Sequence, residues 1–305
     1  MSVGEDIAPA VRRRLLDHAR AHGDDFQRLL VRYAIERLLY RLSRTEAAER
    51  YMLKGAMLFA TWSEQAIRPT GDLDLLGGGD PSSEAIAELF RAICAAEVAP
   101  DGIVFDPATI SIDPVREAET YRGVQLSLKA LLAKATAIVR VDIGFGDHVH
   151  PAPKLQIFPT LFDDMPAARV LMYPPETVIA EKFEAMISIG MINSRVKDFY
   201  DLWIATRTFS FEMSPVVEAV TGTLHRRATP LPERTPIGLA AEFAARVADR
   251  GYWTGFLRRT APVIKPPAFE ELQAELRGFF DPVITMLARP DEARGTWDRD
   301  RRAWV

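Results

Sequence analysis

Residues 103–145 constrain the fold of this chain more than any other segment, because they contain several stretches of β type in close succession. In AIVRVDIGFG, the apolar residues Val139, Val141 and Ile143 alternate with polar ones. A period of two is typical of a strand that buries one face. Together with IVFDPATISID and YRGVQLSLKALL, this stretch predicts neighbouring strands of one mixed sheet.

Helical patterns surround these strands. The stretch DDFQRLLVRYAIERLLYRLS predicts an amphipathic helix, and the apolar run YMLKGAMLFATW predicts a second one. A strand, DLDLLG, and a helix capped by Ser82 or Ser83 follow. Further short strands, LQIFPTLF and ARVLMYP, precede two helices, and the pattern beyond residue 210 is helical. The sequence therefore predicts an α/β part over residues 1–170, with N-terminal helices, and a mainly helical part over residues 171–305.

The bulk composition is that of a globular protein and decides little about function. The 305 residues carry a net charge of -4, so any contact with a polyanion requires a local basic patch. A single cysteine, Cys94, excludes a disulfide framework and a cysteine-rich metal site, which favours a cytoplasmic protein. The sequence has no signal-peptide pattern and no apolar run near the roughly 18 residues of a membrane span, so we expect no membrane partner.

The stretch RPTGDLDL places two carboxylates at the beginning of a predicted strand. Residues i and i+2 of a strand project from the same face about 7 Å apart, so Asp72 and Asp74 would point together. Two such carboxylates repel each other unless a cation binds them, and Mg²⁺ prefers one or two carboxylates with water and phosphate oxygens. The pair indicates metal-assisted phosphoryl or nucleotidyl transfer, although aspartates that only solvate a strand edge would give the same pattern.

Three further residues could belong to such a site. Asp142 faces away from Val141 and Ile143 on its predicted strand, so it could complete the metal site or could simply face solvent. Upstream, Lys54 and Gly55 lie where a backbone without a side chain could approach a triphosphate.

Four segments in order, LKGAMLF, RPTGDLDL, PPETVIAEKFEAM and SRVKDFYDLW, resemble the AbiEii-type nucleotidyltransferase toxins, the MenT-like toxins of type IV toxin–antitoxin and phage-defence systems. The third segment matches the family's helix with a Glu-Lys pair at Glu181 and Lys182. The fourth matches its Arg-x-Lys-Asp-x-x-Asp-Leu motif at Arg195, Lys197, Asp198, Asp201 and Leu202. The resemblance covers most of residues 24–205. It implies an α+β fold with a DNA-polymerase-β-like nucleotidyltransferase core, a mixed sheet with flanking helices, and a helical C-terminal region.

The resemblance also implies an activity and partners. The expected enzyme uses Mg²⁺, or alternatively Mn²⁺, to transfer a nucleoside monophosphate from a nucleoside triphosphate to an RNA acceptor, above all the 3′ end of tRNA. A cognate antitoxin protein is the expected partner. Two alternatives remain open: nucleotidylation of a protein partner, and a non-catalytic module that binds a nucleotide or a partner on the same fold.

Each matched position acquires a role through the resemblance. Thr70 and Asp72 correspond to the family's hydroxyl-x-carboxylate, Lys182 to its catalytic lysine and Asp198 to its later acidic residue. The expected metal ligands are Asp72, Asp74 and Asp142. The expected nucleotide-binding residues are Lys54, Gly55, Arg68, Arg195 and Lys197.

The lysine and the later aspartate also have a physical interpretation. Lys182, contributed by the helical part, would offer a point charge to the triphosphate, and Asp198 could hold that lysine in position. Without the resemblance, Glu181 and Lys182 would be interpreted as an exposed pair on a helix. Lys197 and Asp201 would then form an ordinary i, i+4 salt bridge.

Overall fold

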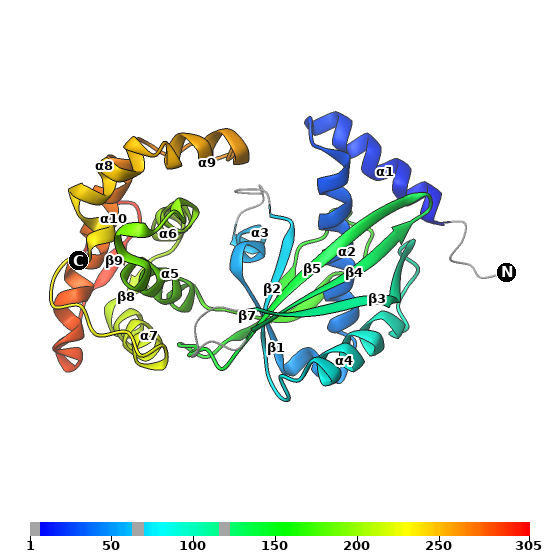
Figure 1. Ribbon diagram of the computed structural model, residues 1–305, viewed down its shortest axis with the longest axis horizontal. Helices are drawn as coiled ribbons and strands as arrows, with labels where there is room; N and C mark the ends of the chain where they lie inside the picture. Colours follow the sequence, from blue (N-terminus) through cyan, green and yellow to red (C-terminus); the bar gives the residue numbers. More distant parts are fainter. Residues whose placement is uncertain (1–6, 63–69, 116–122) are drawn as a thin grey trace. The chain divides into compact units, whose positions relative to one another are not determined.

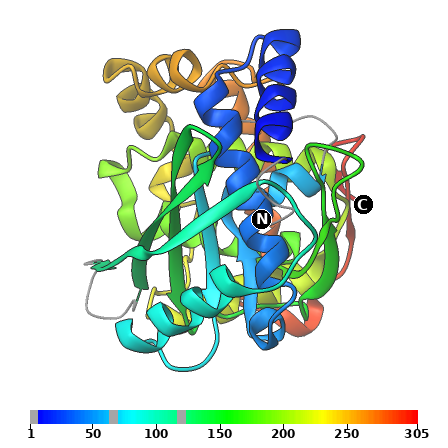
Figure 2. The same cartoon turned by 90° about the vertical axis from the view of Figure 1, so that its right-hand side faces the viewer.

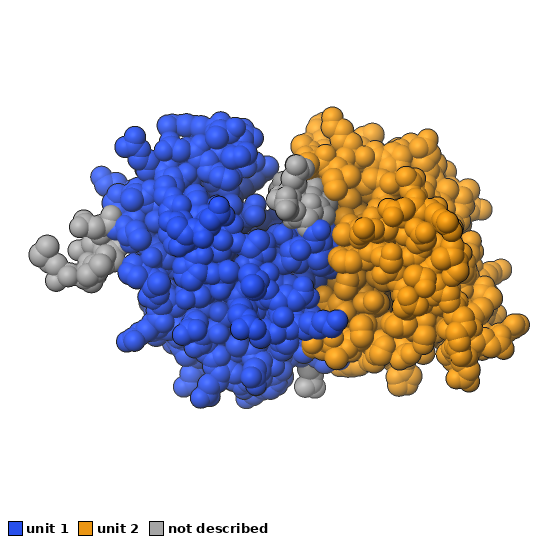
Figure 3. Space-filling model, turned by 180° about the vertical axis from the view of Figure 1, so that it is seen from behind, with its two compact units in different colours: residues 1–146, 154–172 blue, residues 147–153, 173–305 orange. Residues whose placement is uncertain are grey.

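The computed structural model describes residues 7–62, 70–115 and 123–305. Figure 3 colours its two compact units. The first comprises residues 1–146 and 154–172, and the second comprises residues 147–153 and 173–305. The segment 147–153 belongs to the second unit, although it precedes the expected boundary at residue 170. No helix in the described part of the chain is both long and apolar enough to cross a bilayer.

The described part of the first unit contains a mixed sheet of seven strands in the order β3-β4-β5-β2-β1-β7-β6. These strands are β1 (Tyr51–Lys54), β2 (Asp72–Gly77), β3 (Ile103–Val115), β4 (Gly123–Leu132), β5 (Ala135–Phe145), β6 (Lys154–Phe158) and β7 (Ala168–Met172). β2 runs parallel to β5 and antiparallel to β1. The predicted alternation is confirmed, because Val139, Val141 and Ile143 are all buried.

Helices cover one face of this sheet (Figures 1 and 2). α1 (Ile7–His22) contacts β4, and α2 (Phe26–Leu42) packs against β5 and β7. α4 (Ser83–Ala95) lies against β3 and also contacts α2. Leu73 and Leu75 of β2 are buried on this covered face together with the apolar residues of β5. Burial of this face accounts for much of the stability of the unit, because apolar area removed from water contributes about 25 cal/mol per Å².

Two of these helices begin at side-chain caps. Asp25 accepts a hydrogen bond from the backbone N–H of Arg28 at 2.9 Å, and Ser82 accepts one from Ala85 at 3.3 Å. Each bond satisfies an N–H group that the first helical turn leaves without a partner. The cap predicted for α4 is therefore confirmed at Ser82, and Asp25 caps α2 in the same way.

The apolar run YMLKGAMLFATW does not form the single helix that we expected. Its first four residues form β1, which lies between β2 and β7, and short helical turns η2 (Gly55–Leu58) and α3 (Phe59–Trp62) follow. Tyr51 and Leu53 are buried and Met52 and Lys54 are partly exposed, which is the alternation of a strand. Four residues are too few for periodicity to distinguish a strand from a helix, and pairing on both sides decides the outcome.

The second unit is mainly helical, as predicted. Its helices are α5 (Pro175–Ile189), α6 (Val196–Thr208), α7 (Met213–Arg226), α8 (Ala241–Asp249), α9 (Tyr252–Thr260) and α10 (Phe269–Leu287). Phe183 of α5 stacks on Phe280 of α10 with ring centroids 4.3 Å apart. A small sheet, in the order β10-β9-β8, was not predicted, because its strands are only two or three residues long. They are β8 (Phe211–Glu212), β9 (Thr296–Asp298) and β10 (Ala303–Trp304).

The chain also contains short 3₁₀ turns. They are η1 (Glu46–Glu49) in the first unit, and η3 (Gly190–Ile192), η4 (Ile237–Leu239) and η5 (Pro290–Glu292) in the second.

Candidate active site

Three acidic residues of the predicted site, Asp72, Asp74 and Asp142, lie on the face of the sheet opposite to α1, α2 and α4. In the strand register, Asp74 of β2 is paired with Lys54 of β1 on one side and with Asp142 of β5 on the other. Paired residues of neighbouring strands project from the same face, and Asp72 joins them because it lies two residues from Asp74. All four side chains are partly exposed, whereas Leu73 between the two aspartates is buried. The structure therefore brings these predicted site residues together on one open face.

Gln125 of β4 orients the carboxylate of Asp142. The two residues are paired in the register of β4 and β5, and Nε2 of Gln125 donates a hydrogen bond of 2.8 Å to Oδ1 of Asp142. Sequence reasoning did not identify Gln125, because the contact depends on which strand lies beside β5. Asp142 is thus a carboxylate with a fixed orientation, and its role as a metal ligand stays a prediction.

Gly55 packs its backbone against the carboxylate of Asp74. The residue directly follows β1 and has a φ of +68°, a conformation that side chains other than hydrogen disfavour. A Cβ at this position would overlap Oδ2 and Cγ of Asp74. Gly55 is therefore required by its own backbone conformation and by its contact with Asp74. Its predicted approach to a phosphate remains a prediction.

Thr70 and Arg68 complete the predicted residues of this segment. Thr70 is partly exposed, and its Oγ1 donates a long hydrogen bond, 3.4 Å, to the carbonyl oxygen of Asp72. This bond steadies the beginning of β2. Arg68 lies outside the described residues. The roles of Thr70 in catalysis and of Arg68 in nucleotide binding stay predictions.

The acidic face fits a hard divalent cation by its donor chemistry. Asp72 and Asp74 offer carboxylate oxygens, and Mg²⁺ needs only one or two such ligands because water and phosphate oxygens complete its octahedron. Within the described ranges, no group of three or more His, Cys, Asp or Glu residues is arranged to hold a metal ion. The protein would therefore supply part of the coordination shell, and the substrate would supply the rest.

In the second unit, Lys182 of α5 donates to two aspartates of α6. Its Nζ lies 2.7 Å from Oδ1 of Asp198 and 2.9 Å from Oδ2 of Asp201. The side chain of Lys182 is 14% exposed, and that of Asp201 is fully buried. The interpretation of Lys182 as part of an exposed helix pair is therefore wrong. The alternative, an ordinary surface salt bridge between Asp201 and Lys197, does not fit, because Asp201 is buried and bonds to Lys182 instead.

Arg195 extends this cluster toward solvent. Its Nε lies 2.8 Å from Oδ2 of Asp198, an ion-pair distance without hydrogen-bond geometry, and its side chain is 47% exposed. Burial would raise the pKa of Asp198, but the charges of Lys182 and Arg195 outweigh burial and hold that pKa below its ordinary value. Lys197 is exposed on the first turn of α6. The nucleotide contacts of Arg195 and Lys197 stay predictions.

A second ion network, which sequence reasoning missed, surrounds Arg227 directly after α7. The guanidinium lies 3.4 Å from Oε1 of Glu181 and 2.8 Å from Oε2 of Glu184, both on α5. The hydroxyl of Tyr173 lies 3.3 Å from Oε1 of Glu181. Burial would lower the pKa of Arg227, but the surrounding carboxylates raise it above its ordinary value. The network was missed because the basic run 225–227 has the sequence pattern of an ordinary solvent-exposed helix end.

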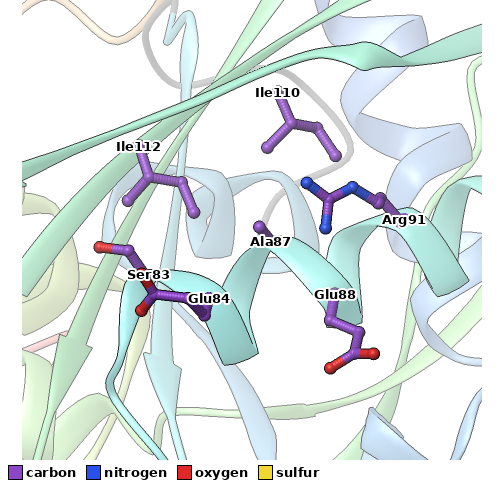
Figure 4. A pocket seen from close by; sticks show the side chains of 7 residues that line it. All are labelled: Ser83, Glu84, Ala87, Glu88, Arg91, Ile110 and Ile112. Carbon is purple, nitrogen blue, oxygen red and sulfur yellow. The ribbon is translucent and has the colours of Figure 1, made fainter.

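A groove of about 470 Å³ lies elsewhere in the first unit, between α4 and β3 (Figure 4). It is lined by Ser83, Glu84, Ala87, Glu88, Arg91, Ile110 and Ile112. Ile112 is paired with buried Leu126, so it projects to the face of the sheet that the helices cover. The groove therefore lies on the opposite face from the acidic residues and is not part of their site.

One family model accounts for most of the chain. The family described as nucleotidyl transferase AbiEii toxin, of type IV toxin–antitoxin systems, matches residues 37–275. The chain belongs to the AbiEii family. It is a nucleotidyltransferase, and membership of this toxin family implies a nucleotide substrate and an antitoxin partner.

Two solved structures from Helicobacter pylori are similar to this AbiEii-family chain. A candidate nucleotidyltransferase aligns with a TM-score of 0.50 and 14% sequence identity over 87% of this chain and 98% of that chain. JHP933 aligns with a TM-score of 0.48 and 14% identity over 88% and 96%. No curated protein is significantly similar to this chain. The first likeness shows the fold, so the predicted α+β nucleotidyltransferase core with its helical C-terminal region is confirmed.

Proposed function

We propose that this AbiEii-family enzyme uses Mg²⁺ to transfer a nucleoside monophosphate from a nucleoside triphosphate to RNA, with the 3′ end of tRNA as the acceptor. The observation that carries this proposal is the open sheet face on which Asp72, Asp74 and Asp142 project together. Carboxylates on such a face can share a metal ion with phosphate oxygens. Mn²⁺, which accepts the same oxygen ligands, is the alternative metal.

The residues of the first unit bind and orient in this proposal. Asp72 and Asp74 hold the metal, and the contact of Gly55 with Asp74 fixes one of the two carboxylates. Asp142, oriented by Gln125, faces the same side of the sheet and would have to approach the other two carboxylates to act as the third ligand. The bound metal would neutralise negative charge on the phosphate oxygens. The acceptor hydroxyl would lose its proton to water as its oxygen forms a bond to the α-phosphorus, and the bond from that phosphorus to the pyrophosphate oxygen would break, which releases pyrophosphate.

We assign to Lys182 of the second unit the point charge that the triphosphate requires. Its two hydrogen bonds to aspartates keep the ammonium in one position, and preorganised charge stabilises a transition state without further rearrangement. Asp198 holds Lys182 and Arg195 together. Arg195 and Lys197 are exposed cations of the same region and would contact the nucleotide.

The biological setting in this proposal is a toxin of a type IV toxin–antitoxin or phage-defence system that acts in the cytoplasm. The family supports the toxin and its antitoxin partner. The single cysteine of the chain suits a reducing compartment.

The direct test is labelling of RNA. The purified protein is incubated with Mg²⁺, total tRNA and each nucleoside triphosphate labelled at the α-phosphate, and we expect labelled tRNA with at least one of them. Asp72→Asn keeps the shape of the side chain and removes a metal ligand, so it should lower the rate by about 10³-fold. Asp163→Asn, at an exposed position of the same unit, is the control and should leave the rate unchanged. Equal labelling by the parent and Asp72→Asn would overturn the assignment.

The same reactions distinguish the alternatives. A labelled protein band with unlabelled RNA would show nucleotidylation of a protein, which uses the same donor and a different acceptor. Growth inhibition that is undiminished in Asp74→Asn, together with no labelling of any acceptor, would favour a non-catalytic binding module. Labelling that EDTA abolishes and added Mg²⁺ or Mn²⁺ restores would support the metal.

A further inference from the structure

The ammonium group of Lys182 has a second carboxylate partner, Asp201, to which the predicted site gives no role. Its Oδ2 accepts a hydrogen bond of 2.9 Å from Nζ of Lys182. The side chain of Asp201 is fully buried, whereas that of Asp198 is 6% exposed. The more deeply buried of the two carboxylates is thus the one without an assigned function.

We propose that Asp201 is a positioning residue that fixes the direction of the Lys182 ammonium. The inference rests on the proposed function in one respect, namely that Lys182 acts on the triphosphate. Asp198 and Asp201 divide two tasks. Asp198 joins Lys182 to Arg195, and Asp201 anchors Lys182 to the interior of the unit.

The geometry of α6 makes Asp201 a rigid anchor. Asp198 and Asp201 are three residues apart, so their side chains lie on the same side of the helix, one turn after the other. Phe199, Tyr200 and Leu202 around them are fully buried, and this packing holds the helix in place. A lysine has a flexible four-carbon stem, and bonds to two successive turns of a packed helix restrict its ammonium far more than one bond would.

The net charge of the cluster around Lys182 indicates that the cluster orients the ammonium and does not attract the triphosphate from a distance. Lys182 and Arg195 carry two positive charges, and Asp198 and Asp201 carry two negative ones, so the four groups sum to zero. The neighbouring Arg227, directly after α7, pairs with Glu181 and Glu184 of α5 and with Asp147, so it adds no unbalanced cation. A neutral cluster attracts a triphosphate weakly at a distance. The role of Asp201 is therefore to keep the ammonium of Lys182 in one direction when the triphosphate is bound.

The kinetic test is Asp201→Asn, which keeps the shape of the side chain and removes its charge. We expect kcat to fall by about 10- to 100-fold, because a misplaced catalytic group costs up to about 10²-fold. The KM for the nucleoside triphosphate should stay within about twofold of the parent or decrease, because removal of a carboxylate does not weaken attraction of an anion. An unchanged kcat, or a rise in KM that accounts for the whole loss of kcat/KM, would overturn the proposal.

Glu275→Gln is the matched control. Glu275 of α10 accepts hydrogen bonds from Trp203 and Arg207 of α6, so this variant also removes a carboxylate that is bonded across to α6. It should leave kcat unchanged. A loss of kcat equal to that of Asp201→Asn would show that any weakening of α6 has this effect, and would overturn the positioning role.

A spectroscopic measurement tests the anchor without any substrate. The chain has only seven lysines, so ¹³C-labelled lysine gives few ε-carbon signals, and Lys182→Gln identifies that of Lys182. We expect a shifted signal with restricted motion in the parent, and a change in both properties in Asp201→Asn. A Lys182 signal in the parent that resembles an exposed, freely rotating lysine would overturn the proposal even if the variant does not fold. An inactive parent with an anchored Lys182 would instead overturn the proposed function alone.

Discussion

The acidic sheet face and the Lys182 cluster differ in how far their charged side chains are exposed to solvent. On the sheet face, Asp72, Asp74 and Asp142 project from neighbouring positions of β2 and β5 and remain partly exposed. In the cluster, Lys182 and Asp201 bond to each other at 2.9 Å and are largely or fully removed from water. The first arrangement leaves carboxylates accessible to a cation from solution, and the second pairs its carboxylates with Lys182 inside the unit. In our proposal, the charges placed by strand register bind a metal ion, and those placed by burial orient Lys182.

This contrast has a consequence for stability. Like charges on a half-exposed face repel one another, so conversion of one carboxylate to an amide costs the fold little. A buried ion pair differs, because removal of one partner leaves an uncompensated charge in the interior. Variants of the two regions should therefore separate loss of activity from loss of stability.

The largest expected effect comes from Lys182→Met. This change leaves the carboxylates of Asp198 and Asp201 buried without the ammonium, which should lower the free energy of unfolding by about 3–5 kcal/mol. It should also abolish labelling of the acceptor. Urea unfolding followed by circular dichroism measures the first effect.

Two controls define that comparison. Lys197→Met removes a lysine from an exposed position of α6 and should change the free energy of unfolding by less than about 0.5 kcal/mol. Asp72→Asn should be equally mild, in spite of its loss of activity. If Asp72→Asn destabilises as much as Lys182→Met, the distinction between an open binding face and a buried cluster is lost.

An intermediate effect is expected for Gly55→Ala, with Gly23→Ala as its matched control. Both glycines have a φ of +68°, so each substitution carries a similar backbone strain of about 1–2 kcal/mol. Only at Gly55 does the added Cβ overlap Asp74, whereas at Gly23 it meets nothing within 4 Å. We expect activity to fall about 10- to 100-fold in Gly55→Ala alone, because Asp74 must move. Equal losses in both variants would show that strain, and not the position of Asp74, is responsible.

The sequence predicts those features that depend on local periodicity. Alternation places Asp72, Asp74 and Asp142 opposite the buried residues of their strands, and the structure has them there. The contact between Gly55 and Asp74 could not be predicted, because it depends on the register that pairs β1 with β2.

The partner of Asp201 shows a second limit of local rules. The i, i+4 rule pairs it with Lys197, which is correct only for an exposed helix face. In the structure, Asp201 is buried and bonds to Lys182 of α5, a residue 19 positions earlier in the chain. Which face of α6 is buried depends on the helices packed around it, and the sequence of α6 alone does not contain that information.

The smallest effect expected concerns acid stability and the lowered pKa of Asp198. Because the pKa of this carboxyl in the folded chain lies below its ordinary value of 3.8, the ionised form stabilises the fold at neutral pH. That contribution is fully present above the unfolded value and is lost as the pH falls through the folded value. Asp198→Asn has no such carboxyl, so the parent should exceed the variant in stability at pH 7 and pH 5, and the difference should shrink below about pH 4. Urea midpoints of both proteins at pH 7, 5, 4 and 3 measure this difference. A difference that stays constant down to pH 3 would show that the ion pairs of Asp198 with Lys182 and Arg195 do not stabilise the charged form, and the cluster would then resemble the open acidic face.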